Sequence, residues 1–125
     1  MTSSAQPLGV QFATALAAKD FERVRGLLHD EVDFRGLTPN RFWEATGPDA
    51  VIAEILHEWF AESDEIEELV AVDSGTVSDR ERVGYRLRVR NPDGVHLVEQ
   101  QAYLAERDGQ IAWMRIVCAG FRPID

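Results

Sequence analysis

The main hydrophobic period of the chain changes near residue 65, apart from one short alternating segment at 31–36. Before that point apolar residues recur every three or four positions, and after it they alternate with polar residues. The first pattern is typical of helices with one buried face, and the second of strands with one face on a core. We therefore expect an α+β fold in which helices of the first half cover an antiparallel sheet of the second half.

Three helices are expected within the first 60 residues. The first carries Phe12, Ala13 and Leu16 on one stripe, and the second follows Asp20, a residue type favoured at the N-cap. The third begins at Gly47-Pro48, since proline is favoured in the first turn of a helix. The apolar residues expected on one side of the second and third helices are Phe21, Val24, Leu27, Leu28, Ile52, Ile55, Leu56, Trp59 and Phe60.

Strands are expected at residues 31–36 and throughout the second half. The segment between the first strand and the third helix, LTPNRFWEATGP, contains two prolines and a glycine, so we expect a loop that carries Trp43. Turn sequences at 91–94 and 107–110 divide the alternating runs into hairpin-linked strands. A further turn between Asp79 and Arg80 would place Asp73 opposite Arg86 on the outer face.

Length and charge limit the possible partners. A chain of 125 residues, 45% of them apolar, is expected to form one domain over residues 1–125. It lacks a long apolar run and an evident signal peptide, and Cys118 is its single cysteine, so a cytoplasmic location is expected. The net charge of −9 argues against nucleic acid and membrane partners. Twelve arginines against one lysine, Lys19, suggest a bacterial source.

The order of elements resembles that of the nuclear-transport-factor-2-like superfamily, nearly end to end. The segment YLAERDGQIAWMRI resembles the final hairpin of that family, and DFERVRGLLHDEVDFRG and GPDAVIAEILHEWF resemble earlier elements. The resemblance implies three N-terminal helices packed on a curved antiparallel sheet, a cystatin-like roll that forms a cone with a small apolar pocket. The superfamily includes ketosteroid isomerases, SnoaL-like polyketide cyclases, epoxide hydrolases and members without catalytic activity, so the fold alone does not give the activity.

The resemblance implies that the catalytic residues of the ketosteroid isomerases are absent. Alignment places Phe12 where those enzymes have a tyrosine and Ala102 where they have an acid, and neither side chain donates a hydrogen bond. The position of their catalytic base falls on Arg35 or Gly36, and neither suits proton abstraction. The carboxylates of the epoxide hydrolases also find no match, so whether the chain is an enzyme stays open.

The same alignment places mostly apolar residues on the concave face of the sheet. Those residues are Val83, Tyr85, Leu87, Val98, Gln100, Ala102, Leu104, Met114, Ile116 and Cys118, and the cone is closed by Phe34, Trp43, Leu56, Trp59 and Phe60. The residues predicted to bind a ligand are Trp43, Trp59, Tyr85, Gln100, Ala102, Met114 and Cys118. Tyr85 and Gln100 are the polar exceptions, which either anchor a ligand or bond to each other, to backbone or to water.

Cysteine and histidine give no stronger signal. Cys118 could act as a nucleophile beside His96, which has the same strand parity, but a core role is the commoner one for a free cysteine. The histidines His29, His57 and His96 have no metal-ligand spacing. No metal and no cofactor are expected.

The outward-facing residues of the last two strands form an apolar and aromatic patch. It comprises Leu97, Glu99, Gln101, Tyr103, Ile111, Trp113, Arg115 and Val117. Monomers rarely expose such a patch, and related domains commonly dimerise through this face, so a homodimer is expected. The alternative is that the C-terminal segment FRPID covers it.

The sequence thus predicts a small domain that binds a small apolar molecule, with catalysis left open. One alternative is a polyketide-cyclase-like or isomerase-like enzyme that acts on a hydrophobic carbonyl compound through Tyr85, Gln100, Arg41 or His57. Another is a non-catalytic dimeric interaction module whose pocket is filled by its own side chains. A closed interior favours the module, and a cavity that reaches solvent beside an acid or a histidine favours the enzyme.

Overall fold

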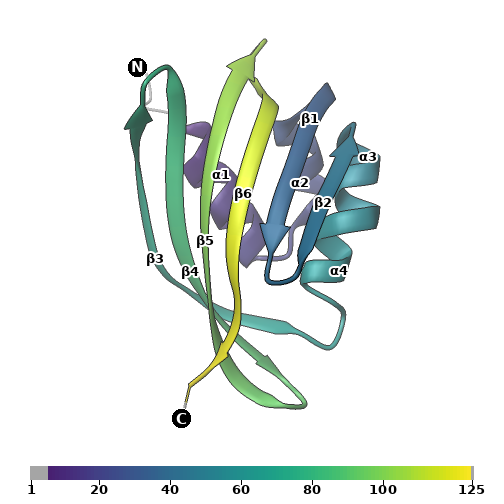
Figure 1. The fold of residues 1–125 in the computed structure, drawn as a ribbon, viewed down its shortest axis with the longest axis vertical. Helices are drawn as coiled ribbons and strands as arrows, with labels where there is room; N and C mark the ends of the chain where they lie inside the picture. Colours follow the sequence, from purple (N-terminus) through teal and green to yellow (C-terminus); the bar gives the residue numbers. More distant parts are fainter. Residues whose placement is uncertain (1–5, 125) are drawn as a thin grey trace.

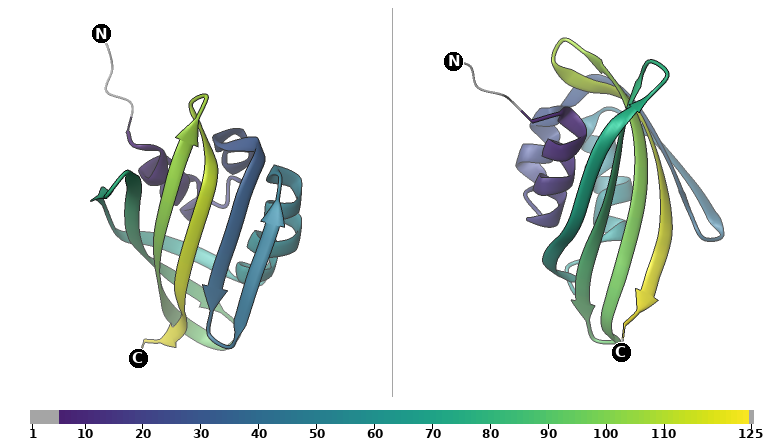
Figure 2. Two further views of the ribbon diagram at one scale, coloured as in Figure 1. Left: turned by 45° about the horizontal axis from the view of Figure 1, so that its top comes forward. Right: turned by 90° about the vertical axis from the view of Figure 1, so that its left-hand side faces the viewer.

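A computed structural model describes residues 6–124 and places all the helices against one face of a curved, open sheet (Figure 1). The view along the sheet edge shows the helices on its concave side (Figure 2). Helix α1 spans Leu8–Ala17 and α2 spans Phe21–Leu27. The third helix is continuous over three segments: α3 at Pro48–Ala50, a π-wound segment η1 at Val51–Leu56, and α4 at His57–Trp59.

The sheet has six strands in the order β2-β1-β6-β5-β4-β3. Their bounds are β1 Leu28–Thr38, β2 Arg41–Thr46, β3 Glu65–Val77, β4 Arg80–Asn91, β5 Gly94–Arg107 and β6 Gln110–Pro123. Neighbouring strands are antiparallel except β1 and β6, which are parallel. The expected α+β architecture is confirmed, and the expectation of a purely antiparallel sheet is wrong at that one pair.

The sequence signals for the helices are confirmed by their local contacts. Asp20 caps α2, since its Oδ1 accepts a hydrogen bond from the backbone N–H of Arg23 at 3.1 Å. Pro48 lies in the first turn of the third helix, whose apolar side is buried while Glu54 and Glu58 face solvent. The described part of the chain contains no helix that is both long and apolar enough to cross a membrane.

The segment expected to be a loop is strand β2 and its turn. Pro39 and Asn40 form the two-residue connection, with Asn40 at a φ of 69°, and β2 then pairs antiparallel with β1. Proline does not interrupt the ladder because it lies in the turn and not in the strand. Trp43 is therefore fixed on an edge strand, opposite Gly36.

The expected pairing of β3 with β4 is wrong by two residues. The turn lies one position earlier, at Ser78 and Asp79, so Asp73 pairs with Gly84 and its carboxylate contacts the Arg82 guanidinium at 2.7 Å. Asp73 and Arg86 still share the outer face, because Gly84 and Arg86 are two positions apart. A bulge between Leu69 and Ala71 leaves Val70, expected on the inner face, exposed, and half-buried Leu69 packs on the core.

The core lies between the helices and the concave face, and it contains Ile111. That residue was expected on the outer face, but a bulge between Ala105 and Glu106 reverses the parity of β6 there and buries it completely. Strand β6 runs on to Pro123, and the N–H of Ile124 donates to the carbonyl of Val95 at 2.9 Å. The C-terminal residues thus extend the sheet beside β5.

Candidate functional site

Three polar side chains lie in a row across the middle of the concave face. Tyr85 of β4 pairs with Gln100 of β5, and Gln100 pairs with Cys118 of β6. Their exposed fractions are 2%, 0% and 8%, and the neighbouring inward positions are apolar. The alternation of each strand puts the three residues on one face, so the row is fixed by the register of the sheet.

The Tyr85 phenol orients the Gln100 amide. Its hydroxyl donates a hydrogen bond to Gln100 Oε1 at 2.5 Å. Burial, with a smaller contribution from nearby Cys118, raises the pKa of Tyr85 far above its usual value, so the phenol stays a neutral donor. The other end of the amide, Gln100 Nε2, is buried and has no hydrogen-bond partner among the described residues. Such a group costs about 1–3 kcal/mol when it is left unpaired.

Two further buried nitrogens lack partners within residues 6–124. They are Nε1 of Trp59, in the third helix, and Nδ1 of His96, on β5. Trp59 and Gln100 both present N–H groups, so what the interior lacks is a hydrogen-bond acceptor. A carbonyl oxygen or a water molecule would satisfy that need.

Gly36 determines how closely Trp59 approaches the sheet. A Cβ atom at residue 36 would lie 2.6 Å from the Trp59 ring, so only glycine allows this contact. The Trp59 ring centroid also lies 6.1 Å from those of Phe34 and Trp43. These aromatic residues cover the concave face near the polar row.

The residues predicted to bind a ligand lie on or over the concave face. Trp59, Ala102 and Met114 are buried there together with the polar row, whereas Trp43 is half-buried at the edge of the sheet. The Trp43 indole N–H donates to Thr38 Oγ1 at 2.8 Å, and the Arg41 guanidinium lies 3.6 Å from its ring centroid. Their role in binding stays a prediction.

The described side chains of the concave face and the helices pack into one core, the arrangement that the interaction-module alternative predicts, and a cavity that reaches solvent lies outside that core. That cavity, of about 550 Å³, lies between the junction of α1 and α2 and the end of the third helix. Its lining residues are Lys19, Phe21, His57, Phe60 and Glu62. Sequence reasoning missed it as a site because these residues come from two distant segments that share no motif.

Of the groups proposed for the alternative enzyme, Tyr85 and Gln100 are brought together, whereas Arg41 and His57 lie in other contacts. Arg41 stacks on Trp43 at the start of β2, and His57 lines the surface cavity with its ring 4.8 Å from that of Phe21. His96 lies against Phe121, with ring centroids 5.7 Å apart, and the Cys118 thiol accepts from the Gly120 N–H at 3.4 Å. The thiol thus has no histidine contact within the described chain that would activate it.

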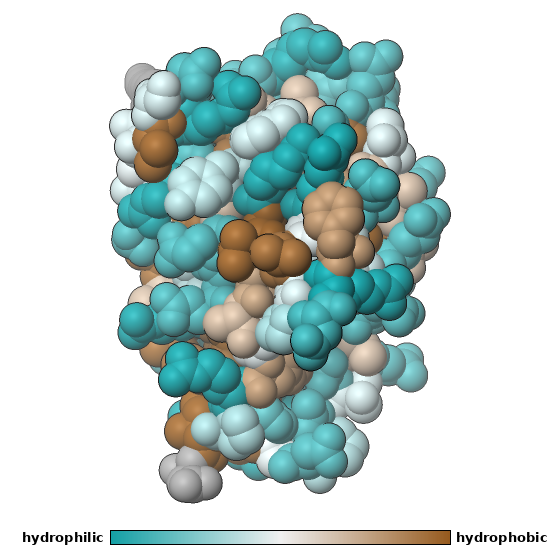
Figure 3. Space-filling model, in the orientation of Figure 1, coloured by the Kyte–Doolittle hydropathy of each residue, from teal (hydrophilic) through white to brown (hydrophobic). Residues whose placement is uncertain are grey.

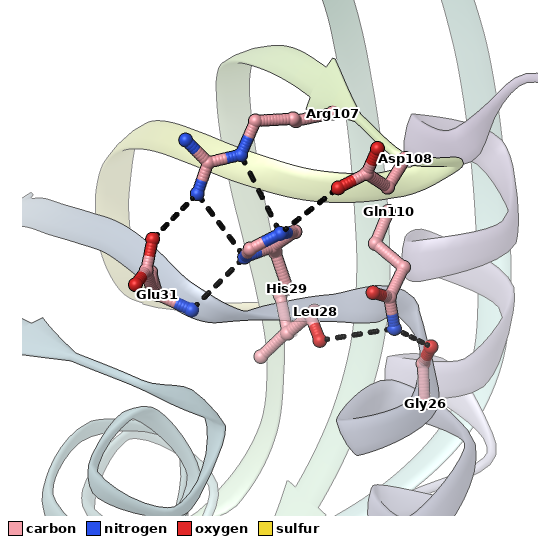
Figure 4. Close-up of polar contacts among 7 residues, drawn as sticks. All are labelled: Gly26, Leu28, His29, Glu31, Arg107, Asp108 and Gln110. Carbon is pink, nitrogen blue, oxygen red and sulfur yellow. Dashed lines mark hydrogen bonds and ion pairs between the residues drawn. The ribbon is translucent and has the colours of Figure 1, made fainter.

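A second polar cluster, around His29, joins the β5–β6 turn to the start of β1 (Figure 4). Arg107 contacts His29 and forms a 2.8 Å ion pair with Glu31, while Asp108 lies 3.5 Å from the imidazole. Gln110 donates to the carbonyl of Gly26 at 3.0 Å. Because these contacts connect backbone segments and line no cavity described above, the cluster is a structural clamp. Residues 6–124 contain no group of three or more potential metal ligands.

Comparisons with known proteins identify the fold. Neither the protein-family models nor the curated proteins give a match to the sequence. Among solved structures, an LEH-like epoxide hydrolase from M. tuberculosis matches with a TM-score of 0.65 and 16% identity, over 89% of this chain and 79% of that one. A Catenulispora acidiphila protein with a ketosteroid isomerase-like fold, solved with trimethylamine, matches with a TM-score of 0.66 and 9% identity. The match covers 90% of this chain and 85% of that one.

An NTF2-like protein of unknown function from Cytophaga hutchinsonii covers nearly the whole chain. It matches with a TM-score of 0.56 and 14% identity, over 98% of this chain and 96% of that one. At these identities the likeness concerns the fold, and the expected α+β arrangement of three helices on a curved, unclosed sheet is confirmed. The apolar pocket and the cystatin-like roll stay predictions.

Proposed function

Starting from the nuclear-transport-factor-2-like fold of this chain, we propose that it binds a small, largely apolar molecule inside the cone through a hydrogen-bond acceptor such as a carbonyl oxygen. The observation that carries the proposal is the buried, unpartnered Nε2 of Gln100. A buried N–H of this kind calls for an acceptor, because leaving it unpaired costs about 1–3 kcal/mol.

The polar row also indicates the charge of the ligand. Tyr85, Gln100 and Cys118 place no formal charge among the apolar residues, and burial would penalise an ionic ligand. A neutral ketone, ester or lactone therefore suits the site better than a carboxylate. The packed interior requires that side chains such as Trp59 move when the ligand enters, and the small side chain of Ala102 lies on the same face of β5 as the amide.

Tryptophan emission and calorimetry test the binding. Titration with neutral cyclic ketones of increasing size should give a saturable change in emission, since Trp43 and Trp59 border the interior. Trp113 lies on the outer face between the Arg80 and Arg115 guanidinium groups, so the variant Trp113→Phe should retain the change. Ala102→Phe fills the interior and should abolish the binding heat. No saturable change for any ketone would contradict the proposal.

A double variant separates binding from stability. Tyr85→Phe/Gln100→Leu removes both partners of the buried hydrogen bond and the unpaired amide, so its free energy of unfolding should equal or exceed that of the parent. Its affinity for a ketone should fall about tenfold, toward that of the matching hydrocarbon, which corresponds to the loss of one hydrogen bond. Equal ketone affinity in the parent and in a folded double variant would show that the amide does not contact the ligand.

A second candidate role, homodimerisation through the outer face of the sheet, rests on a separate observation. Leu37, Phe42 and Val117 are about half exposed there, at 51%, 56% and 51%, near half-buried Trp113 and Tyr103. Apolar side chains gather near the middle of this face (Figure 3). We propose that a second copy of the chain covers this patch, because apolar surfaces of this kind are typical of protein interfaces. This proposal is compatible with a ligand inside the cone.

A further inference from the structure

The surface cavity beside Lys19 has the size of a small-molecule site. Its volume of about 550 Å³ lies within the usual range of about 300–1,000 Å³ for such sites. One wall comes from the junction of α1 and α2, and the other from the end of the third helix and the segment that follows it. None of the polar row on the concave face lines this cavity.

Two phenylalanines give the cavity apolar walls. Phe60 is almost completely buried, and its ring centroid lies 6.0 Å from that of Phe121 behind it. Phe21 is half-buried and meets the His57 ring edge to face, with centroids 4.8 Å apart and an interplanar angle of 76°. The rings are held by these contacts, so an apolar ligand would meet a preformed surface.

Lys19 brings a positive charge to the cavity, where the only carboxylate among the described lining residues is that of Glu62. Its Nζ donates to the carbonyl oxygens of Ala61, at 2.7 Å, and Asp64, and it forms no ion pair within residues 6–124. The Asp64 carboxylate accepts hydrogen bonds from two other groups, the Ala61 N–H and the Asn91 side-chain amide, each at 2.9 Å. An ammonium group has three N–H donors, so one donor and the net charge remain for a ligand.

We propose that this cavity is a second ligand site that takes a small carboxylate with an apolar body. The carboxylate would meet the Lys19 ammonium, and the body would lie against Phe21 and Phe60. Two backbone carbonyls hold the ammonium in place before the ligand arrives, which reduces the entropy lost on binding. Glu62, exposed at the rim, disfavours ligands with a second negative charge. The site is independent of the proposed ketone site in the interior.

The test uses phenylacetate as the probe and phenylacetamide as its neutral control. In NMR titrations of the ¹⁵N-labelled full chain, phenylacetate should give saturable shifts of the backbone amides of residues 19–21 and 57–62. Glu62→Gln removes the repulsion and should tighten phenylacetate binding about two- to fivefold, the effect of one solvated charge. The same substitution should leave the affinity for phenylacetamide unchanged.

Lys19→Met should weaken phenylacetate binding to the level of phenylacetamide. Because this variant also loses two hydrogen bonds, the Glu62→Gln comparison stands on its own if Lys19→Met does not fold. The proposal is overturned if phenylacetate gives no saturable shift, if its shifts centre on Gln100, or if Glu62→Gln leaves its affinity unchanged. Ketone titrations followed at Gln100 report on the interior site separately.

Discussion

The phenol of Tyr85 makes the stability of the folded chain sensitive to alkaline pH. Burial raises its pKa far above the ordinary value, so the folded protein keeps it neutral while the unfolded chain ionises it near pH 10. The stabilisation is fully present below about pH 10 and is lost as the pH rises above it, by up to about 1.4 kcal/mol per pH unit. Denaturant unfolding at pH 9 and 11 should therefore show a smaller loss in Tyr85→Phe than in the parent.

Half-buried Tyr103 supplies the control for that experiment, because Tyr103→Phe also removes one phenol. Tyr103→Phe should keep the steeper alkaline loss of the parent. If Tyr85→Phe loses as much free energy of unfolding as the parent between the two pH values, the phenol is not held neutral by the fold.

For single residues, the sequence predicts which side chains face inward better than it predicts their hydrogen-bond partners. The alignment implied by the family resemblance places Tyr85 and Gln100 on the concave face, and both are buried there. The hydrogen bond between them follows from their being directly opposite in the β4–β5 ladder, which depends on the register. The sequence gives no signal for the unpaired Nε2 of Gln100, because that feature depends on the absence of a hydrogen-bond acceptor near it in the described part of the folded chain.

Two glycines in helices test how closely the helices pack on the sheet. In α1, a Cβ at Gly9 would lie 2.8 Å from the Cβ of buried Val83, so Gly9→Ala should lower the free energy of unfolding by about 1–3 kcal/mol. In α2, a Cβ at Gly26 would meet nothing within 4 Å. Gly26→Ala should therefore raise that free energy by about 0.4–1 kcal/mol, through the unfolded state.

Chemical denaturation of the two variants and the parent measures both effects in one series. The two substitutions should change the free energy of unfolding in opposite directions, although both exchange glycine for alanine in a helix. A stabilising Gly9→Ala would show that α1 does not press against β4.

The elements differ in how far their sequences determine them. The third helix has a long apolar stripe and a proline at its start, and its span was predictable. Strand β2 was missed because the two prolines and the glycine of residues 37–48 indicate a loop, whereas Pro39 and Asn40 form a tight turn between two paired strands. The register of β3 was missed at Asp73 because the turn lies at Ser78 and Asp79, one position earlier than expected, and toward Glu65 because single-residue bulges leave no pattern in an exposed edge strand.

For the whole molecule, the exposed patch on the outer face predicts a dimer. Sedimentation of the parent at micromolar concentration should give twice the chain mass of 14.1 kDa. Val117→Glu places a charge in the patch and should give the monomer, whereas Val70→Glu, on the exposed edge strand β3, should not. A parent that sediments as a monomer, or a dimer that Val117→Glu leaves intact, would exclude this face as the interface.

The central claim is that the Gln100 amide meets the acceptor of a ligand inside the cone, and NMR tests it most directly. With the full chain labelled with ¹⁵N and saturated with the ketone that binds most tightly, the Gln100 side-chain amide protons should shift. They should also show nuclear Overhauser contacts to the ketone protons next to the carbonyl. A saturating ketone that leaves the Gln100 amide signals unchanged, with its contacts at the outer face or at the Lys19 cavity, would contradict the claim.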